Sequence, residues 1–123
     1  MTTINPEIVR DIVLADCKLS IDELESDCRK GRVTFARAII TTVLRDHTDM
    51  SFPEISKLIR TRHTSHATAK EGDSRVRAGS HDDDATTLWG IPTTGMDYAR
   101  YVWHRADEAT IALSSVRFGR GAL

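Results

Sequence analysis

The chain has little of what builds β-sheets and membrane spans. Among its 123 residues are only two Trp, two Tyr and three Phe, and runs that alternate apolar and polar residues are nearly absent. Half-buried strands need that alternation, so the sequence predicts an all-α protein, long enough for one domain with an appendage. No apolar run approaches the roughly 20 residues of a membrane-spanning helix, and the N-terminus lacks a signal-peptide pattern. We therefore expect a cytoplasmic protein that does not contact the membrane.

Motifs for cofactors, metals and catalysis are also missing. Cys17 and Cys28 match neither a metal-ligand nor a redox spacing, so reduced thiols are expected. No phosphate-binding loop of the form GxxxxGK[ST] occurs, and no nucleophile and base stand at catalytic spacing. The acidic run HDDD at 81–84 is interpreted as a solvated turn, and His104 with its acidic neighbours 107–108 as a surface ion-pairing set. The sequence thus predicts no enzyme activity, no cofactor and no metal site.

The net charge of −1 conceals an uneven distribution. Residues 1–28 hold 2 basic and 7 acidic side chains, residues 29–70 hold 9 and 3, and residues 71–123 hold 6 and 8. Binding to a polyanion requires an excess of positive charge, although a solvated arginine-rich helix face gives the same count. Because the basic excess coincides with the helical motif described below, nucleic-acid binding is the favoured interpretation.

Capping residues and apolar spacing predict a series of short helices in the first 70 residues. Asn5 before Pro6 is typical of a helix start, and the capping boxes SIDE and SFPE begin two further helices. Along 33–47 apolar residues recur every three or four positions, with arginines on another face, and the basic turn RKGR precedes this helix. The helices are expected at 6–16, 20–28, 33–47, 52–59 and about 62–70.

The segment SFPEISKLIRTRHTSHATAK, at 51–70, has the order of a helix-turn-helix. A capped two-turn helix is followed by a tight turn without glycine and by a short polar helix. The second helix carries hydrogen-bonding side chains that suit base edges in the major groove of DNA, namely Arg62, His63, Thr64, Ser65 and Thr68. An ordinary exposed polar helix would carry similar residues, so the segment alone leaves both interpretations open.

The amino-acid composition and the hydrophobic pattern change after residue 70. Residues 71–96 are rich in Gly, Ser, Thr and Asp without a helical or strand period, which predicts a linker or long loop, and 97 to about 116 resumes a helical pattern. This terminal helix either closes the core or pairs with a second copy of the chain. Trp89 and Trp103 are expected to be packing or interface residues. The predicted organisation is a helix-turn-helix domain at 1–70, a linker or long loop at 71–96 and a C-terminal helical extension at 97–123.

The run from 29 to 70 resembles the C-terminal DNA-binding domain of the bacterial replication initiator DnaA. That family places a basic loop before a long helix, then a motif like SLPEI, then RDHTTVLHA; here SFPEI stands at 51–55 and RHTS at 62–65, with Ala69 in the later position. With the helices upstream, the resemblance covers about residues 5–70. It implies an all-α, Trp-repressor-like helix-turn-helix fold that binds double-stranded DNA in the bacterial cytosol or nucleoid, encoded by a bacterial or a phage genome.

The resemblance also implies roles for individual residues. Arg29 matches the arginine that enters the minor groove, and Arg37 the one that contacts a phosphate or a base. Pro53 stands where a helix N-terminus faces phosphate, and the HTS of 63–65 where the family reads base edges and thymine methyls. Thr68 replaces the family's second histidine. The residues expected at DNA are Arg29, Lys30, Arg32, Arg37, Pro53, Arg60, Arg62, His63, Thr64, Ser65 and Thr68.

Three positions depart from the family pattern. The turn 60–62 is one residue shorter than the family's Gly-Gly-Arg-Asp, His66 and Ala67 replace Val-Leu, and Ala38 replaces a glutamine. The resemblance therefore implies DNA binding but not the DNA sequence that is read. Two functions follow: a stand-alone regulator or accessory factor of replication or transcription, without ATPase activity, or a protein-interaction module that binds a component of the replication machinery. Dimerisation through the terminal helix is compatible with either.

Overall fold

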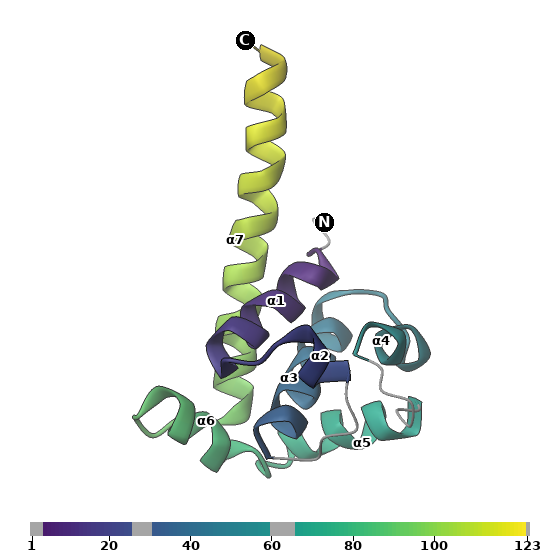
Figure 1. Ribbon diagram of the computed structural model, residues 1–123, viewed down its shortest axis with the longest axis vertical. Helices are drawn as coiled ribbons and strands as arrows, with labels where there is room; N and C mark the ends of the chain where they lie inside the picture. The colour runs from purple at the N-terminus through teal and green to yellow at the C-terminus, as the bar shows by residue number, and fades with distance from the viewer. Residues whose placement is uncertain (1–3, 26–30, 60–65, 123) are drawn as a thin grey trace.

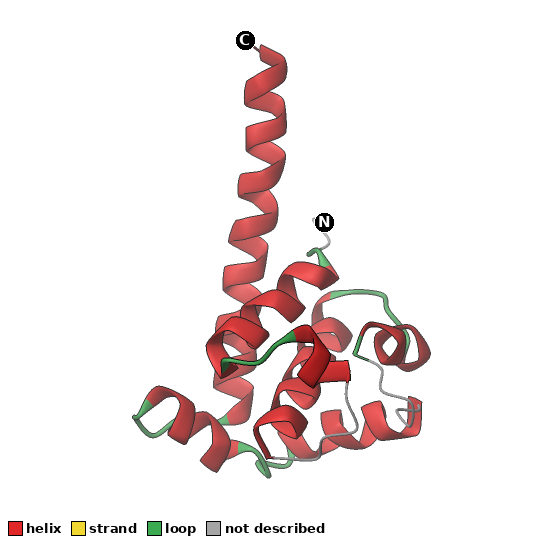
Figure 2. Ribbon diagram, viewed as in Figure 1, coloured by secondary structure: helices red, strands yellow, loops and turns green. Residues whose placement is uncertain are grey.

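The computed structural model describes residues 4–25, 31–59 and 66–122, and within these ranges it contains helices and no strand (Figures 1 and 2). The predicted all-α fold is therefore confirmed. Side chains are described within these ranges except for 66–67 and for those beyond 113. The helices are α1 (Pro6–Cys17), α2 (Ile21–Glu25), α3 (Gly31–His47), α4 (Phe52–Leu58), α5 (His66–Arg77), α6 (Asp82–Trp89) and α7 (Gly95–Ala122).

The first helices begin where the capping residues predict. The Asn5 side chain accepts a hydrogen bond of 2.9 Å from the backbone N–H of Glu7, with proline in the first turn of α1. At α4, the Ser51 hydroxyl accepts from the N–H of Glu54, while the Glu54 carboxylate accepts from the N–H of Ser51. These side chains satisfy backbone donors that a helix leaves unpaired, so the local sequence is sufficient to set these starts.

Helix α3 is the centre of the fold. It contacts each of the six other helices, and ten of its residues are buried. The apolar stripe predicted from the sequence is buried, while Ala38 and Thr42, on another side of α3, contact α5. A single hydrophobic core surrounds α3 and extends along the chain from Ile4 to Ala106. Residues beyond 70 therefore contribute to the same core as those before it.

The expectation of a linker or long loop over 71–96 is wrong. Helix α5 continues to Arg77, well past the predicted end near residue 70, and α6 follows after four residues. The residues that suggested a loop form helix ends instead: Gly90 ends α6 with φ 71°, and the Asp82 carboxylate accepts the N–H of Gly95 at 2.9 Å where α7 begins. Composition gave no sign of the helices in this segment, where Val76 and Ala85 pack into the core.

The first half of α7 closes the core, which was one of the two alternatives for this helix. Tyr98, Val102 and Ala106 are fully buried, and the Tyr98 hydroxyl donates a 2.8 Å hydrogen bond to the Asp16 carboxylate of α1. Burial, aided by Asp16, raises the pKa of Tyr98, so this hydroxyl stays protonated. Farther along, α7 projects away from the body of the molecule (Figure 1), and Leu113 is 55 % exposed.

Both tryptophans pack as expected. The Trp89 ring lies edge-on to Tyr98, with 5.4 Å between centroids, and Trp103 stacks on His47 at 4.2 Å. Each of these contacts joins α7 to another helix. Along the described parts of the chain, no helix is both long and apolar enough to cross a membrane.

Candidate nucleic-acid interface

Helices α4 and α5 form the predicted helix-turn-helix, and α4 is held by its apolar side. Ile55 and Ile59 are buried, and α4 contacts both α3 and α5. Pro53 lies in the first turn of α4 and is exposed. The turn between the helices, 60–65, lies outside the described residues.

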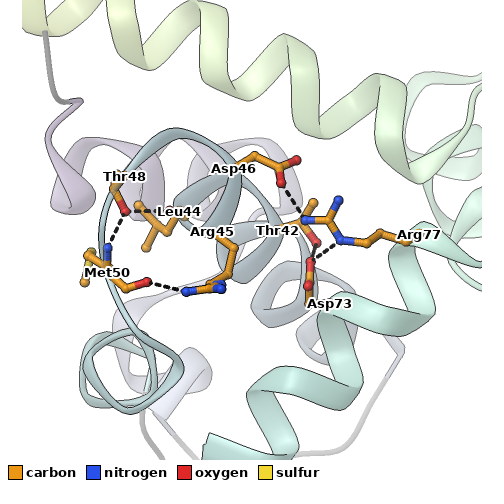
Figure 3. A network of polar contacts seen from close by, with 8 residues as sticks. All are labelled: Thr42, Leu44, Arg45, Asp46, Thr48, Met50, Asp73 and Arg77. Atoms are coloured by element: carbon orange, nitrogen blue, oxygen red, sulfur yellow. Dashed lines mark hydrogen bonds and ion pairs between the residues drawn. The ribbon is translucent and has the colours of Figure 1, made fainter. Parts of the chain in front are cut away.

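The loop that leads into α4 is fixed by an arginine of α3. The Arg45 guanidinium donates a 3.0 Å hydrogen bond to the backbone oxygen of Met50 (Figure 3). It also lies 4.5 Å above the centre of the Phe52 ring. The Thr48 hydroxyl donates to the Leu44 carbonyl at the end of α3 and accepts from the N–H of Met50 at 3.1 Å. The start of the helix-turn-helix is thus attached to the end of α3.

Helix α5 passes close to α3 at a glycine. A Cβ atom added to Gly72 would lie 3.5 Å from both Cα and Cβ of Ala38, so the two helices approach with almost nothing between them. Ala69 and Val76, on either side of this contact, are buried. Ala38, where the family has a glutamine, therefore serves the packing of α5 rather than an exposed surface.

A polar network links α5 to α3 next to this contact (Figure 3). The carboxylate of Asp73, a residue that is 8 % exposed, accepts hydrogen bonds from the Thr42 hydroxyl at 2.8 Å and from Nε of Arg77 at 3.0 Å. Nη2 of Arg77 reaches Asp46 on α3 at 2.6 Å. The hydrogen bond to Asp46, and to a smaller extent the one to Asp73, raises the pKa of Arg77 above its usual value. We call these four residues, Thr42, Asp46, Asp73 and Arg77, the α3–α5 clamp.

The Arg37 side chain makes hydrogen bonds within the protein. Its Nε and Nη2 atoms donate to the backbone oxygen of Leu24 at 3.0 and 2.8 Å, and the side chain is half-buried. This bond holds α2, which immediately precedes the basic loop, against α3. The predicted contact of Arg37 with a phosphate or a base stays a prediction.

Of the other predicted DNA-contacting residues, three lie in described helices and seven lie outside the described residues. Arg32 lies in the first turn of α3 and Thr68 in the first turn of α5, and both are exposed, as is Pro53. Seven residues lie outside the described part of the structure: Arg29, Lys30, Arg60, Arg62, His63, Thr64 and Ser65.

Several residues that matter to this surface were missed at the sequence level. Lys70 and Arg75 are exposed on α5, and Asp73 with Arg77 forms half of the clamp. All four fall where the sequence predicted the end of the helix or a loop. The spacing of Asp73 and Arg77, four residues apart, is typical of a helical ion pair and could have indicated that α5 continues.

His81 and Cys17 are titratable residues outside this interface, and both are buried. Within the described residues, no group of three or more His, Cys, Asp or Glu side chains could hold a metal ion. His81 is buried rather than part of a solvated turn, and its Nδ1 lies 2.9 Å from the Asp84 carboxylate. Cys17 is a buried free thiol, and burial, with Asp16 nearby, raises the pKa of Cys17 to about 12.

Comparisons with known proteins agree with this geometry. The model of the family described as bacterial dnaA protein helix-turn-helix matches residues 6–71. The chromosomal replication initiator protein DnaA of Microcystis aeruginosa is 30 % identical over 79 residues, which are 64 % of this chain and 17 % of that protein. That of Borrelia turicatae is 37 % identical over 57 residues, 46 % of this chain and 12 % of that protein.

The chain thus matches less than a fifth of the length of these curated relatives. No solved structure matches it. The family match covers more than half of the chain and includes α4, the following turn and the first half of α5. The chain belongs to the bacterial dnaA helix-turn-helix family, and its α4–α5 unit is a helix-turn-helix of the DNA-binding type.

Proposed function

We propose that this chain binds double-stranded DNA in a sequence-specific manner, with the first half of α5 in the major groove and the basic segment 29–32, whose last two residues begin α3, in the adjacent minor groove. The observation that carries the proposal is the attachment of α5. Its second half is fixed to α3, while Thr68 and Lys70 in the first half are exposed. A recognition helix needs both properties, because one part of it must be supported by the protein and another part must be exposed to DNA.

The proposed contacts divide into positioning and reading. Arg29, Lys30 and Arg32 would bind in and around the minor groove, where a narrow channel concentrates negative potential. His63, Thr64 and Ser65 would read base edges and methyl groups, with Thr68 one turn later. The remaining basic residues, including Arg60 and Arg62, would contact phosphates.

The cellular role is proposed at a coarser level. We infer a regulator or accessory factor of replication or transcription that reaches DNA without hydrolysing a nucleotide, because the chain contains no phosphate-binding loop. The relatives are named chromosomal replication initiator proteins, which supports a role in replication.

Selection of bound sequences from a random duplex pool tests the proposal. The full chain should enrich a defined sequence, and its affinity should fall steeply with salt because each neutralised phosphate releases counterions. Arg29→Gln should weaken binding to selected and unrelated duplexes, whereas Thr64→Ala should mainly lower the preference for the selected one. Arg100→Gln, with the same change of charge on an exposed position of α7, is the control. Absence of duplex binding at low salt would refute DNA binding.

A second candidate function rests on the projecting part of α7. Ile111 and Leu113 are large apolar side chains that are 49 % and 55 % exposed there. We propose that this part of α7 contacts protein, either a second copy of the chain or a component of the replication machinery. Sedimentation that shows a monomer both alone and on DNA would exclude the dimer, and a pull-down without a replication protein would count against the other partner.

A further inference from the structure

We propose that the α3–α5 clamp sets the rotation of α5 about its axis and so acts as a positioning device for DNA reading. Thr42, Asp46, Asp73 and Arg77 are positioning residues, because none of them belongs to the half of α5 that would face the bases. This inference rests on the proposed function for its consequence at DNA, but its structural part can be tested without DNA.

The apolar contacts of α5 with α3 leave its rotation weakly determined. At the point of closest approach a glycine, Gly72, faces an alanine, Ala38, and neither offers a side chain that interlocks with the other helix. A contact without interdigitating side chains restrains the rotation of a helix less than one in which side chains interlock. The buried apolar residues of α5, Ala69 and Val76, are small or medium-sized. Packing of α5 against α4 and α7 adds to these contacts, and a directional polar interaction would restrict the angle further.

The clamp has the required directionality. Hydrogen bonds weaken steeply away from their preferred angles, so a carboxylate held by two donors can occupy only a narrow range of positions. Asp73 is held by the Thr42 hydroxyl of α3 and by Arg77, whose other end binds Asp46 of α3. Both branches end on α3, one at Thr42 and one at Asp46, and Asp73 is the residue next to Gly72. The angle is thus fixed beside the smooth contact.

A small change in the rotation of α5 would displace its side chains relative to the base edges of DNA. Side-chain atoms of a helix lie about 5 to 6 Å from its axis, so a rotation of about 10° moves them by about 1 Å. A hydrogen bond to a base edge operates over a narrower interval of distance. Loss of the clamp should therefore reduce discrimination between DNA sequences, while contacts with phosphates, which are longer-ranged, are retained.

Two adjacent threonines of α3 provide a matched test. Thr42→Val removes the hydroxyl that bonds Asp73 across the helix interface, and Thr42→Ser restores it. Thr41 is equally buried, but its hydroxyl bonds the Arg37 carbonyl of its own helix. Thr41→Val is thus the same chemical change at the next residue, without effect on the clamp. Arg77→Gln against Arg75→Gln forms a second pair, since Arg75 is exposed and pairs with Glu71 in its own helix.

The first measurement is amide hydrogen exchange of the full chain without DNA. Thr42→Val and Arg77→Gln should accelerate exchange in α5 about tenfold relative to α1, as expected for loss of a hydrogen bond to a charged group. Thr42→Ser, Thr41→Val and Arg75→Gln should leave α5 close to wild type. Equal acceleration in α5 for Thr41→Val and Thr42→Val would overturn the clamp, and so would unchanged exchange in Thr42→Val.

The second measurement compares affinity for a selected duplex with affinity for an unrelated one. Thr42→Val and Arg77→Gln should lower this ratio about tenfold with little effect on binding to the unrelated duplex. An unchanged ratio, together with accelerated exchange, would overturn the role of the clamp in reading. If wild type binds no duplex, the proposed function fails, and the positioning role at DNA fails with it, whereas the exchange result still decides whether the clamp holds α5.

Discussion

The hydrogen bond from Tyr98 to Asp16 links helix α7 to helix α1, and we predict that Tyr98→Phe destabilises the protein. The bond is 2.8 Å long and connects α7 to α1 across 82 positions of sequence. A hydrogen bond to a charged group contributes about 1.5 to 3 kcal/mol. The Asp16 side chain is 23 % exposed and also binds Arg105 at 3.2 Å, so water can partly replace the lost donor. We therefore expect the lower end, about 1.5 kcal/mol.

The assay is thermal and urea unfolding followed by helical circular dichroism. For a chain of this size about 1 kcal/mol shifts Tm by roughly 4 °C, so Tyr98→Phe should lower Tm by about 6 °C. Tyr101→Phe is the matched control, because this tyrosine is 38 % exposed and its hydroxyl accepts a 3.2 Å bond from Arg105 at the surface. It should change stability by less than about 0.5 kcal/mol. If Tyr98→Phe is no more destabilising than Tyr101→Phe, the bond does not anchor α7 to α1.

Three further predictions concern the helices around α3. A chain ending at Leu113 should keep the unfolding midpoint of the full chain, measured by circular dichroism. A chain ending at Gly95 should not fold, because it lacks the core residues of α7. A folded chain ending at Gly95 would refute the single core. Gly72→Ala should stabilise by up to about 1 kcal/mol in urea unfolding, since the added Cβ meets Ala38 at an ordinary contact distance, and a destabilised variant would contradict that geometry. Burial lowers the pKa of His47 below its usual 6.5, so the folded protein binds fewer protons there than the unfolded chain. Its contribution to stability is therefore present above pH 6.5 and lost as the pH falls, and Tm of His47→Gln should decline less between pH 7 and 5; parallel profiles would exclude this effect.

The sequence predicted the fold best where local chemistry sets the structure. The caps at Asn5 and Ser51 and the apolar pattern of 33–47 placed three helices within about two residues of their observed ends. It failed at 71–96, where polar composition indicated a loop. There the helices exist because Val76 and Ala85 reach the core and because Asp73 is paired, and neither fact can be read from a window of neighbouring residues.

The candidate site was predicted in part. The motif at 51–70 located the helix-turn-helix, and the family match confirmed it. The sequence alone placed the arginines of α3 on one exposed face. In the structure Arg37 binds Leu24 and Arg45 binds Met50, so both hold neighbouring segments. A long flexible cation can meet a phosphate or a carbonyl equally well, and only the position of the surrounding helices decides between them.

By itself, the sequence determined that the chain is helical, where its early helices begin and which segment carries the DNA-reading motif. These properties depend on residues within a few positions of each other, through caps, periodicity and motif order. Only the tertiary structure decided that residues beyond 70 complete the core and that α5 extends to Arg77, where the clamp attaches it to α3. These depend on pairs such as Thr42 with Asp73 and Asp16 with Tyr98, far apart in the chain, whose energies exist only once the helices have packed.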